Sequence, residues 1–140
     1  MKCPNCTGVE LVPRQVKGSV MTLYCCTQCK GIWFHRGQME LVVPGVVKSL
    51  AVPRDARLGT RQCPDCVQPM RVFYYPQTIV EIDMCKRCLG LWIDVGEARE
   101  ISLVRRSVKS EAQEPDTVPG TKGQVIDLVN KALDWVMHSY

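Results

Sequence analysis

The sequence predicts a small α+β protein of two tandem, metal-stabilised units, and three observations support this fold class. The segment from Cys26 to Gln38 recurs without a gap as the segment from Cys85 to Glu97. A pair of cysteines precedes each copy. Each unit of about 45 residues is also too short to be stable through hydrophobic burial alone, so disulfides or a metal ion are needed.

The cysteines follow a spacing that binds metal ions. They include four C-x2-C pairs, and each pair makes a tight turn that presents two sulfurs to one ion. The interval between the paired turns falls in the zinc-ribbon range of roughly 15–20 residues. We therefore predict two tetrahedral Zn(Cys)4 sites, each with one structural Zn²⁺ ion as cofactor. The predicted ligands are Cys3, Cys6, Cys26 and Cys29 in the first site and Cys63, Cys66, Cys85 and Cys88 in the second.

The rest of the sequence favours zinc over disulfides. No apolar run approaches the ~20 residues of a membrane span, and Met1-Lys2-Cys3 leaves no room for a signal peptide. We therefore expect a cytoplasmic protein with reduced thiols, for which iron on the same ligands is an alternative to zinc. Four thiolates on one Zn²⁺ carry two net negative charges, so two occupied sites offset the formal charge of +4. The charge therefore does not indicate a general nucleic-acid binder.

Each unit is predicted to contain a β-hairpin. In the first unit, the strands are expected at Leu11-Val12 and Val20–Tyr24. In the second unit, they are expected at Met70–Tyr75 and Thr78–Met84. Each hairpin would bring its two cysteine pairs together around one ion.

A short helix is predicted after each hairpin. Asp94 and Glu97 form a capping box, and apolar residues of the following segment recur on one helix face. In the first unit, His35 and Gln38 take these two positions, and the helix should run from Gln38 to about Val43. Because histidine is a poorer cap than aspartate, the first helix should be the less stable one.

The remaining segments complete the predicted organisation. The two units occupy residues 1–45 and 60–106, an apolar connector spans 46–59, and a flexible linker spans 107–120. Residues 121–140 are predicted to form a C-terminal amphipathic helix with an unusually wide apolar arc. Such an arc needs a partner surface, so we expect a protein partner or a second copy of the chain to bind it. The residues expected at this contact are Val125, Val129, Ala132, Trp135 and Val136.

Several residues allow more than one interpretation. Cys25 could replace Cys26 as a ligand, but the ungapped match between the repeats favours Cys26. Cys25 is then either a small buried hydrophobe or an oxidation-sensitive thiol. His35 is expected at the surface, at the start of a helix, and not at a metal. Trp33 and Trp92 are expected to pack against the metal-binding hairpins, with stacking on nucleic-acid bases as the alternative.

The complete motif resembles that of a known family. Cys-Pro-x-x-Cys, a hairpin and C-x2-C-x-G-hydrophobic-Trp-hydrophobic-Asp-x-Gly-Glu are similar to the bacterial zinc ribbons classed with the transcription-factor-IIB zinc finger. The second unit carries the whole motif, whereas the first departs from it at His35 and Gln38. The resemblance implies two tandem zinc ribbons, each a β-hairpin with two zinc knuckles. In the eukaryotic factor a zinc ribbon contacts RNA polymerase, so the resemblance does not imply sequence-specific DNA binding.

These features predict a non-catalytic adaptor that mediates protein–protein interaction, in a transcription-related role. An enzyme is not expected, because the chain has two histidines, no open metal position and no nucleophile–base signature. Nucleic-acid binding and redox sensing through Cys25 are the alternative functions. Phosphate contacts for nucleic-acid binding would come from Lys17, Lys30, Arg36, Lys48, Arg54 and Arg57.

Overall fold

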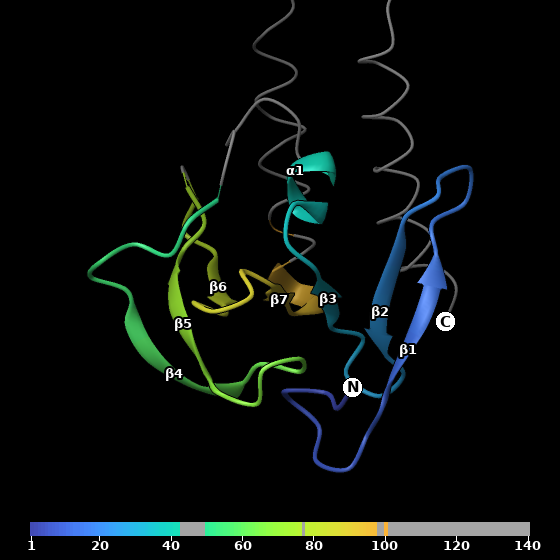
Figure 1. The fold of residues 1–140 in the computed structure, drawn as a ribbon, viewed down its shortest axis with the longest axis horizontal. Coiled ribbons are helices and arrows are strands. Elements are labelled where there is room, and N and C mark those ends of the chain that lie inside the picture. The colour runs from blue at the N-terminus through green and yellow to red at the C-terminus, as the bar shows by residue number, and fades with distance from the viewer. Residues whose placement is uncertain (43–49, 77, 98–99, 101–140) are drawn as a thin grey trace, which may run out of the picture.

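One antiparallel sheet contains the strands of the described residues, which are 1–42, 50–76, 78–97 and 100. In this computed structural model, seven strands lie in the order β1-β2-β3-β7-β6-β5-β4. Figure 1 shows a curved sheet with one hairpin on each side and the short strands β3 and β7 between them. The two repeats therefore share a sheet.

The first repeat forms the predicted hairpin and one additional strand. Strand β1 (Leu11–Gln15) pairs with β2 (Thr22–Cys26), and β2 pairs with β3 (Ile32–Phe34). In the turn of the hairpin, Gly18 has a φ of 78°, a left-handed conformation that favours glycine. Strand β3 was not predicted, because its three residues are all buried and show no alternation of polar and apolar side chains.

The second repeat has the same three strands in the same arrangement. Strand β5 (Pro69–Tyr74) pairs with β6 (Glu81–Met84), and β6 pairs with β7 (Leu91–Ile93). Strand β7, like β3, consists of three buried residues. The equivalence of β1, β2 and β3 with β5, β6 and β7 confirms the internal repeat at the level of the fold.

Strand β4 (Arg57–Gln62) has no equivalent among the strands of the first repeat. It pairs with the outer side of β5 and begins inside the segment that was predicted to be a connector. Gly59 allows the close approach of the two strands, since a Cβ atom there would lie 2.8 Å from Cγ2 of Val72. Arg61 then reaches across β5 to the buried carboxylate of Asp83 on β6. These tertiary contacts are not visible in the local sequence pattern of β4.

The two repeats are joined by the pairing of β3 with β7. Trp33 pairs with Trp92, its equivalent in the other repeat, and Ile32 pairs with Ile93 on one side of this pair. Equivalent residues that pair with each other in antiparallel strands define a local two-fold axis, which passes between the two tryptophans. The repeats are therefore related in the same way as the subunits of a symmetric dimer.

The sheet buries a different cluster of side chains on each face. One face carries an aliphatic core, on which the partly buried Leu50 and Val52 also pack. The other face carries a second core, in which the metal-site cysteines surround the two tryptophans. The buried residues of the aliphatic core are Val16, Leu23, Cys25, Ile32, Phe34, Met39, Tyr75, Val80, Ile82, Met84, Leu91 and Ile93. Those of the second core are Cys3, Leu11, Cys26, Trp33, Cys63, Met70, Cys85 and Trp92.

The structure describes only part of the predicted helices. Helix α1 (Gln38–Val42) follows the first repeat, and residues 95–97 and 100 are helical after the second. The rest of that second helix, the linker at 107–120 and the helix at 121–140 lie outside the described residues, so the structure gives them no support. No helix in the described part of the chain has the length and apolar character needed to cross a membrane.

Candidate metal centres

Each predicted set of four cysteines comes together in space. In both sets, the four Sγ atoms all lie within 4.8 Å of one another. The Sγ atoms of Cys3 and Cys29 are 3.7 Å apart, and those of Cys63 and Cys88 are 3.6 Å apart. Four sulfurs at the Zn–S distance of about 2.3 Å in a tetrahedron lie about 3.8 Å from one another. Each group therefore has the size and the donor set of a structural zinc site.

The second cysteine turn of each repeat has the same backbone geometry. The carbonyl oxygen of Cys26 accepts a hydrogen bond from the N–H of Lys30, and that of Cys85 accepts one from Leu89. Lys30 and Leu89 have φ values of 63° and 59°, which reverse the chain directly after the last ligand. The glycine that follows begins the approach to β3 or β7. The position of these central strands is thus set by the metal-binding turns.

Burial raises the pKa of Cys3 and Cys63, and hydrogen bonds from backbone N–H groups to the sulfurs act in the opposite direction. The N–H of Cys6 donates to Sγ of Cys3 at 3.3 Å, and the N–H of Cys66 donates to Sγ of Cys63 at 3.3 Å. Burial raises the pKa of Cys26, but backbone N–H groups that donate to its sulfur bring the pKa down to about 7. Burial also raises the pKa of Cys85, but hydrogen bonds from backbone N–H groups and from Nε2 of Gln68 bring it down to about 7. Each group therefore contains a sulfur that readily becomes a thiolate, the form that binds zinc.

Cys25 belongs to neither group. The first repeat is one residue longer than the second between its two cysteine pairs, and this residue lies in the first cysteine turn. There the N–H of Cys3 donates to the carbonyl oxygen of Val9, whereas the N–H of Cys63 donates to that of Gln68, which is one residue nearer along the chain. Cys25 lies on the opposite face of the sheet, in the aliphatic core, and its side chain is fully buried. Burial raises its pKa to about 11, which makes it a weak nucleophile.

The two tryptophans pack across the boundary between the repeats and are both fully buried. A Cβ atom on Gly31 would lie 2.7 Å from Cη2 of Trp92 and closer still to Cζ2. A Cβ atom on Gly90 would lie 2.5 Å from Cη2 of Trp33 and closer still to Cζ2. Each indole therefore occupies the space above the glycine of the other repeat, and both rings pack among the metal-site cysteines, as the sequence predicted. In this position neither ring is available for stacking on bases.

Asp65 links the first repeat to the second metal centre and was missed by the sequence analysis. It lies between two predicted ligands of that centre, and its Oδ2 accepts a hydrogen bond from Nε1 of Trp33 at 3.2 Å. Nε2 of His35 lies 3.3 Å from the same oxygen. His35 lies before α1 as expected, but its ring also contacts the rings of Tyr24 and Trp33. The equivalent of Asp65 in the first repeat is Asn5, so the sequence difference itself was the available signal.

In the second repeat, different contacts are made by Asp94 and by two residues that the sequence analysis missed, Arg61 and Asp83. Nη1 of Arg61 lies 2.6 Å from Oδ2 of Asp83, and Nη2 lies 2.6 Å from Oδ2 of Asp94. Asp94 in turn accepts a hydrogen bond from Nε1 of Trp92 at 3.2 Å. Burial raises the pKa of Asp83, while the hydrogen bond from Arg61 acts in the opposite direction. The guanidinium thus holds two carboxylates beside the second tryptophan.

Glu97 is expected to make the stability of the second repeat depend on pH. Its Oε2 accepts a hydrogen bond from the N–H of Asp94 at 2.8 Å, and burial raises its pKa to about 7. The folded state therefore binds the proton more tightly than the unfolded state. The contribution of Glu97 to stability is fully present below its unfolded pKa of about 4.3, and it is lost as the pH rises to about 7.

The substitution Glu97→Gln should remove this dependence and keep the hydrogen bond. Gln38 already provides that bond in the first repeat, where its Oε1 accepts from the N–H of His35 at 2.8 Å. The free energy of unfolding of the variant, relative to that of the unsubstituted protein, should therefore increase as the pH rises from 5 to 8, because glutamine has no proton to lose. Denaturant titrations with zinc present measure this difference, and Glu100→Gln is the control for loss of an exposed charge. A difference that does not change with pH would contradict the assignment.

The fold and the sites together define a class of protein. Two C-x2-C turns that close a four-thiolate group at the base of a β-hairpin are a zinc ribbon, and this chain contains two of them. The family described as transcription factor zinc-finger matches residues 2–43 and 62–102. The chain belongs to this family of TFIIB-type zinc ribbons, as two tandem copies with one structural zinc ion each. No curated protein and no solved structure matches the chain.

Proposed function

We propose that the protein is a non-catalytic adaptor that binds a protein partner through the turns of its two hairpins. The observation that carries this proposal is a matched pair of exposed aliphatic residues. Val20, in the turn between β1 and β2, is 99% exposed, and Ile79, its equivalent between β5 and β6, is 80% exposed. Figure 1 shows both hairpin turns at the same end of the sheet as α1. Paired apolar side chains at the ends of a rigid sheet suit contact with an apolar surface.

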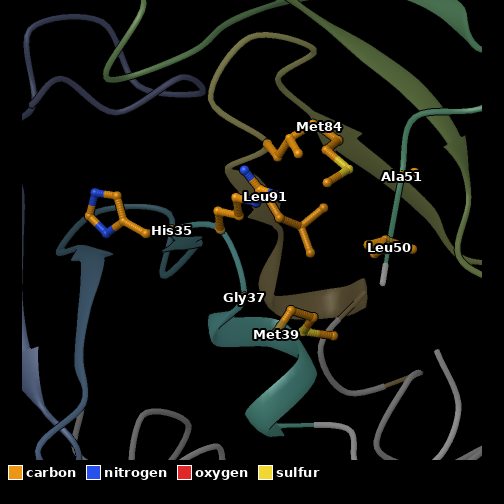
Figure 2. A pocket seen from close by; sticks show the side chains of 9 residues that line it. His35, Gly37, Met39, Leu50, Ala51, Met84 and Leu91 are labelled. Atoms are coloured by element: carbon orange, nitrogen blue, oxygen red, sulfur yellow. The ribbon is translucent and has the colours of Figure 1, made fainter. Parts of the chain in front are cut away.

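The metal sites support a structural role for zinc. All four coordination positions of each ion are taken by thiolates, so a substrate or a catalytic water has no position to occupy. The cavity beside α1 does not suggest a substrate site either. Its volume is about 200 Å³, below the roughly 300 Å³ at which ligand pockets begin. Its lining is mostly apolar, and Figure 2 shows Met84, Leu91 and Met39 near one another among the lining side chains, with His35 to one side.

The edges of the sheet favour the turns over strand addition as the binding elements. Strand β1 carries Pro13, which has no N–H to donate to an added strand. The other edge strand, β4, has an irregular register between Leu58 and Gln62. Both features are ones by which proteins prevent pairing at a sheet edge. The two edges of the sheet are therefore poor sites for the addition of a peptide strand.

The C-terminal helix is a second element of the same proposal. We propose that its apolar arc binds a protein partner or a second copy of the chain, in a cytoplasmic and transcription-related setting. The support is the sequence pattern around Trp135, since this segment lies outside the described residues. Amphipathic helices are common protein-recognition elements.

Charged substitutions test the adaptor proposal. In cross-linking and affinity capture from cells, the double variant Val20→Asp, Ile79→Asp is expected to lose proteins that the unsubstituted chain captures. Leu58→Asp, at a residue that is 61% exposed on β4, is the matched control and should retain them. Trp135→Asp tests the helix in the same way, with the solution mass as the readout for self-association. Equal capture by all variants, with zinc content unchanged, would exclude both elements as contact surfaces.

A further inference from the structure

The two metal centres are connected through the central strands. The last ligands of the two metal groups are Cys29 and Cys88, and strands β3 and β7 each begin three residues after them. The N–H of Cys26 donates to Gly31 at 2.9 Å, and the N–H of Cys85 donates to Gly90 at 2.9 Å, so the ligand turn fixes the start of each strand. A turn that is not closed around a metal leaves its strand without this constraint.

The indole of each repeat completes the metal-binding loop of the other. Trp92 covers Gly31 and Trp33 covers Gly90, and each glycine lies two residues after a ligand. Both indoles belong to the same buried cluster as four of the metal-site cysteines. If one repeat loses its fold, the other loses both the cover over its loop and the partner of its central strand. Burial of large aromatic rings is among the strongest contributions to a small core.

A polar contact from the first repeat to the metal-binding turn of the second adds to this connection. Trp33 and His35 of the first repeat both contact the carboxylate of Asp65, which lies between Cys63 and Cys66. This contact holds the first cysteine turn of the second centre from outside its own repeat. In the first centre Asn5 has the equivalent place, and Trp92 bonds to Asp94 of its own repeat instead.

We propose from this geometry that the two zinc sites are coupled, so that zinc in one site raises the affinity of the other by about 100-fold. The coupling is reciprocal, because each ligand must change the affinity for the other by the same factor. The chain then exists mainly with no zinc or with two zinc ions. The proposal concerns metal loading alone and does not depend on the adaptor role.

Native mass spectrometry of the full chain tests the proposal. Reduced, metal-free protein is equilibrated with buffered Zn²⁺, and the shares of chains with zero, one and two zinc ions are measured at half saturation. A 100-fold coupling between equal sites leaves about one chain in ten with a single zinc. Independent sites leave at least about half of the chains with a single zinc, and this result would overturn the proposal.

Site-specific variants provide a second readout. Cys3→Ser with Cys6→Ser removes the first site, and the zinc affinity of the second site should then fall by about 100-fold in competition with a chromophoric chelator. Cys63→Ser with Cys66→Ser should lower the affinity of the first site by the same factor. Trp33→Leu should weaken the coupling and raise the one-zinc share, whereas Gly96→Ala, whose Cβ meets no atom within 4 Å, should not. Unchanged affinity in both double variants contradicts the coupling.

Discussion

Removal of both zinc ions with a chelator is expected to unfold the sheet as one unit. The four-thiolate groups determine where the central strands begin, and each repeat alone is too small for a stable core. Structural zinc sites of this kind provide roughly 10–16 kcal/mol of apparent binding free energy, which in such small units is folding free energy. This is the largest effect that any single change to the protein should produce.

Circular dichroism and tryptophan fluorescence measure this loss. The β-sheet signal should disappear with the metal, and the emission of the buried Trp33 and Trp92 should shift to longer wavelength. Addition of Zn²⁺ should restore both signals, whereas Mg²⁺, which prefers oxygen ligands, should restore neither. A hairpin signal that persists after complete metal removal is incompatible with a zinc-dependent fold.

Gly31→Ala is expected to be strongly destabilising, although it adds only one methyl group. Its Cβ would overlap the ring of Trp92, which is fully buried and has no space into which to move. Such overpacking destabilises a protein by about 1–3 kcal/mol and occasionally by more, and we expect about 3 kcal/mol here. Gly90→Ala should have a similar effect through Trp33. Denaturant titrations at a fixed free zinc concentration provide the measurement.

Two further variants show whether the effect comes from the contact between the repeats. Gly96→Ala is the control, since the added Cβ meets no atom within 4 Å. In a double-mutant cycle, Trp92→Leu should reduce the additional loss caused by Gly31→Ala, because the smaller side chain leaves room for the methyl group. Two results would refute this contact between the repeats: equal stability of the Gly31→Ala and Gly96→Ala variants, or additive effects of Gly31→Ala and Trp92→Leu.

The sequence was sufficient to predict the two groups of four cysteines and the hairpins, because both depend on local spacing. The C-x2-C pairs and the alternating strands are local patterns, and the family match covers the same two regions. The capping contacts of Gln38 and Glu97 were predictable for the same reason, and both hydrogen bonds are present.

The joining of the repeats depends on contacts between distant residues and was not predictable in this way. Strands β3 and β7 have three residues each, all buried, so they show no periodicity. Gly31 and Trp92 were both recognised as repeated residues, but nothing local indicates that one covers the other. Arg61 was unremarkable in the sequence, because its importance comes from Asp83 and Asp94, far along the chain.

The local two-fold axis between Trp33 and Trp92 has a consequence for how the two halves diverge. Three residue pairs connect β3 with β7, and the two buried clusters also contain residues of both halves. Covalent linkage holds the halves at a high effective concentration, so they do not have to associate as separate chains. The halves are therefore free to become different. They already differ at equivalent positions, since the first has His35 where the second has Asp94, and Asn5 where the second has Asp65. A fused pair of this kind presents two unlike surfaces, which two identical subunits about the same axis would not do.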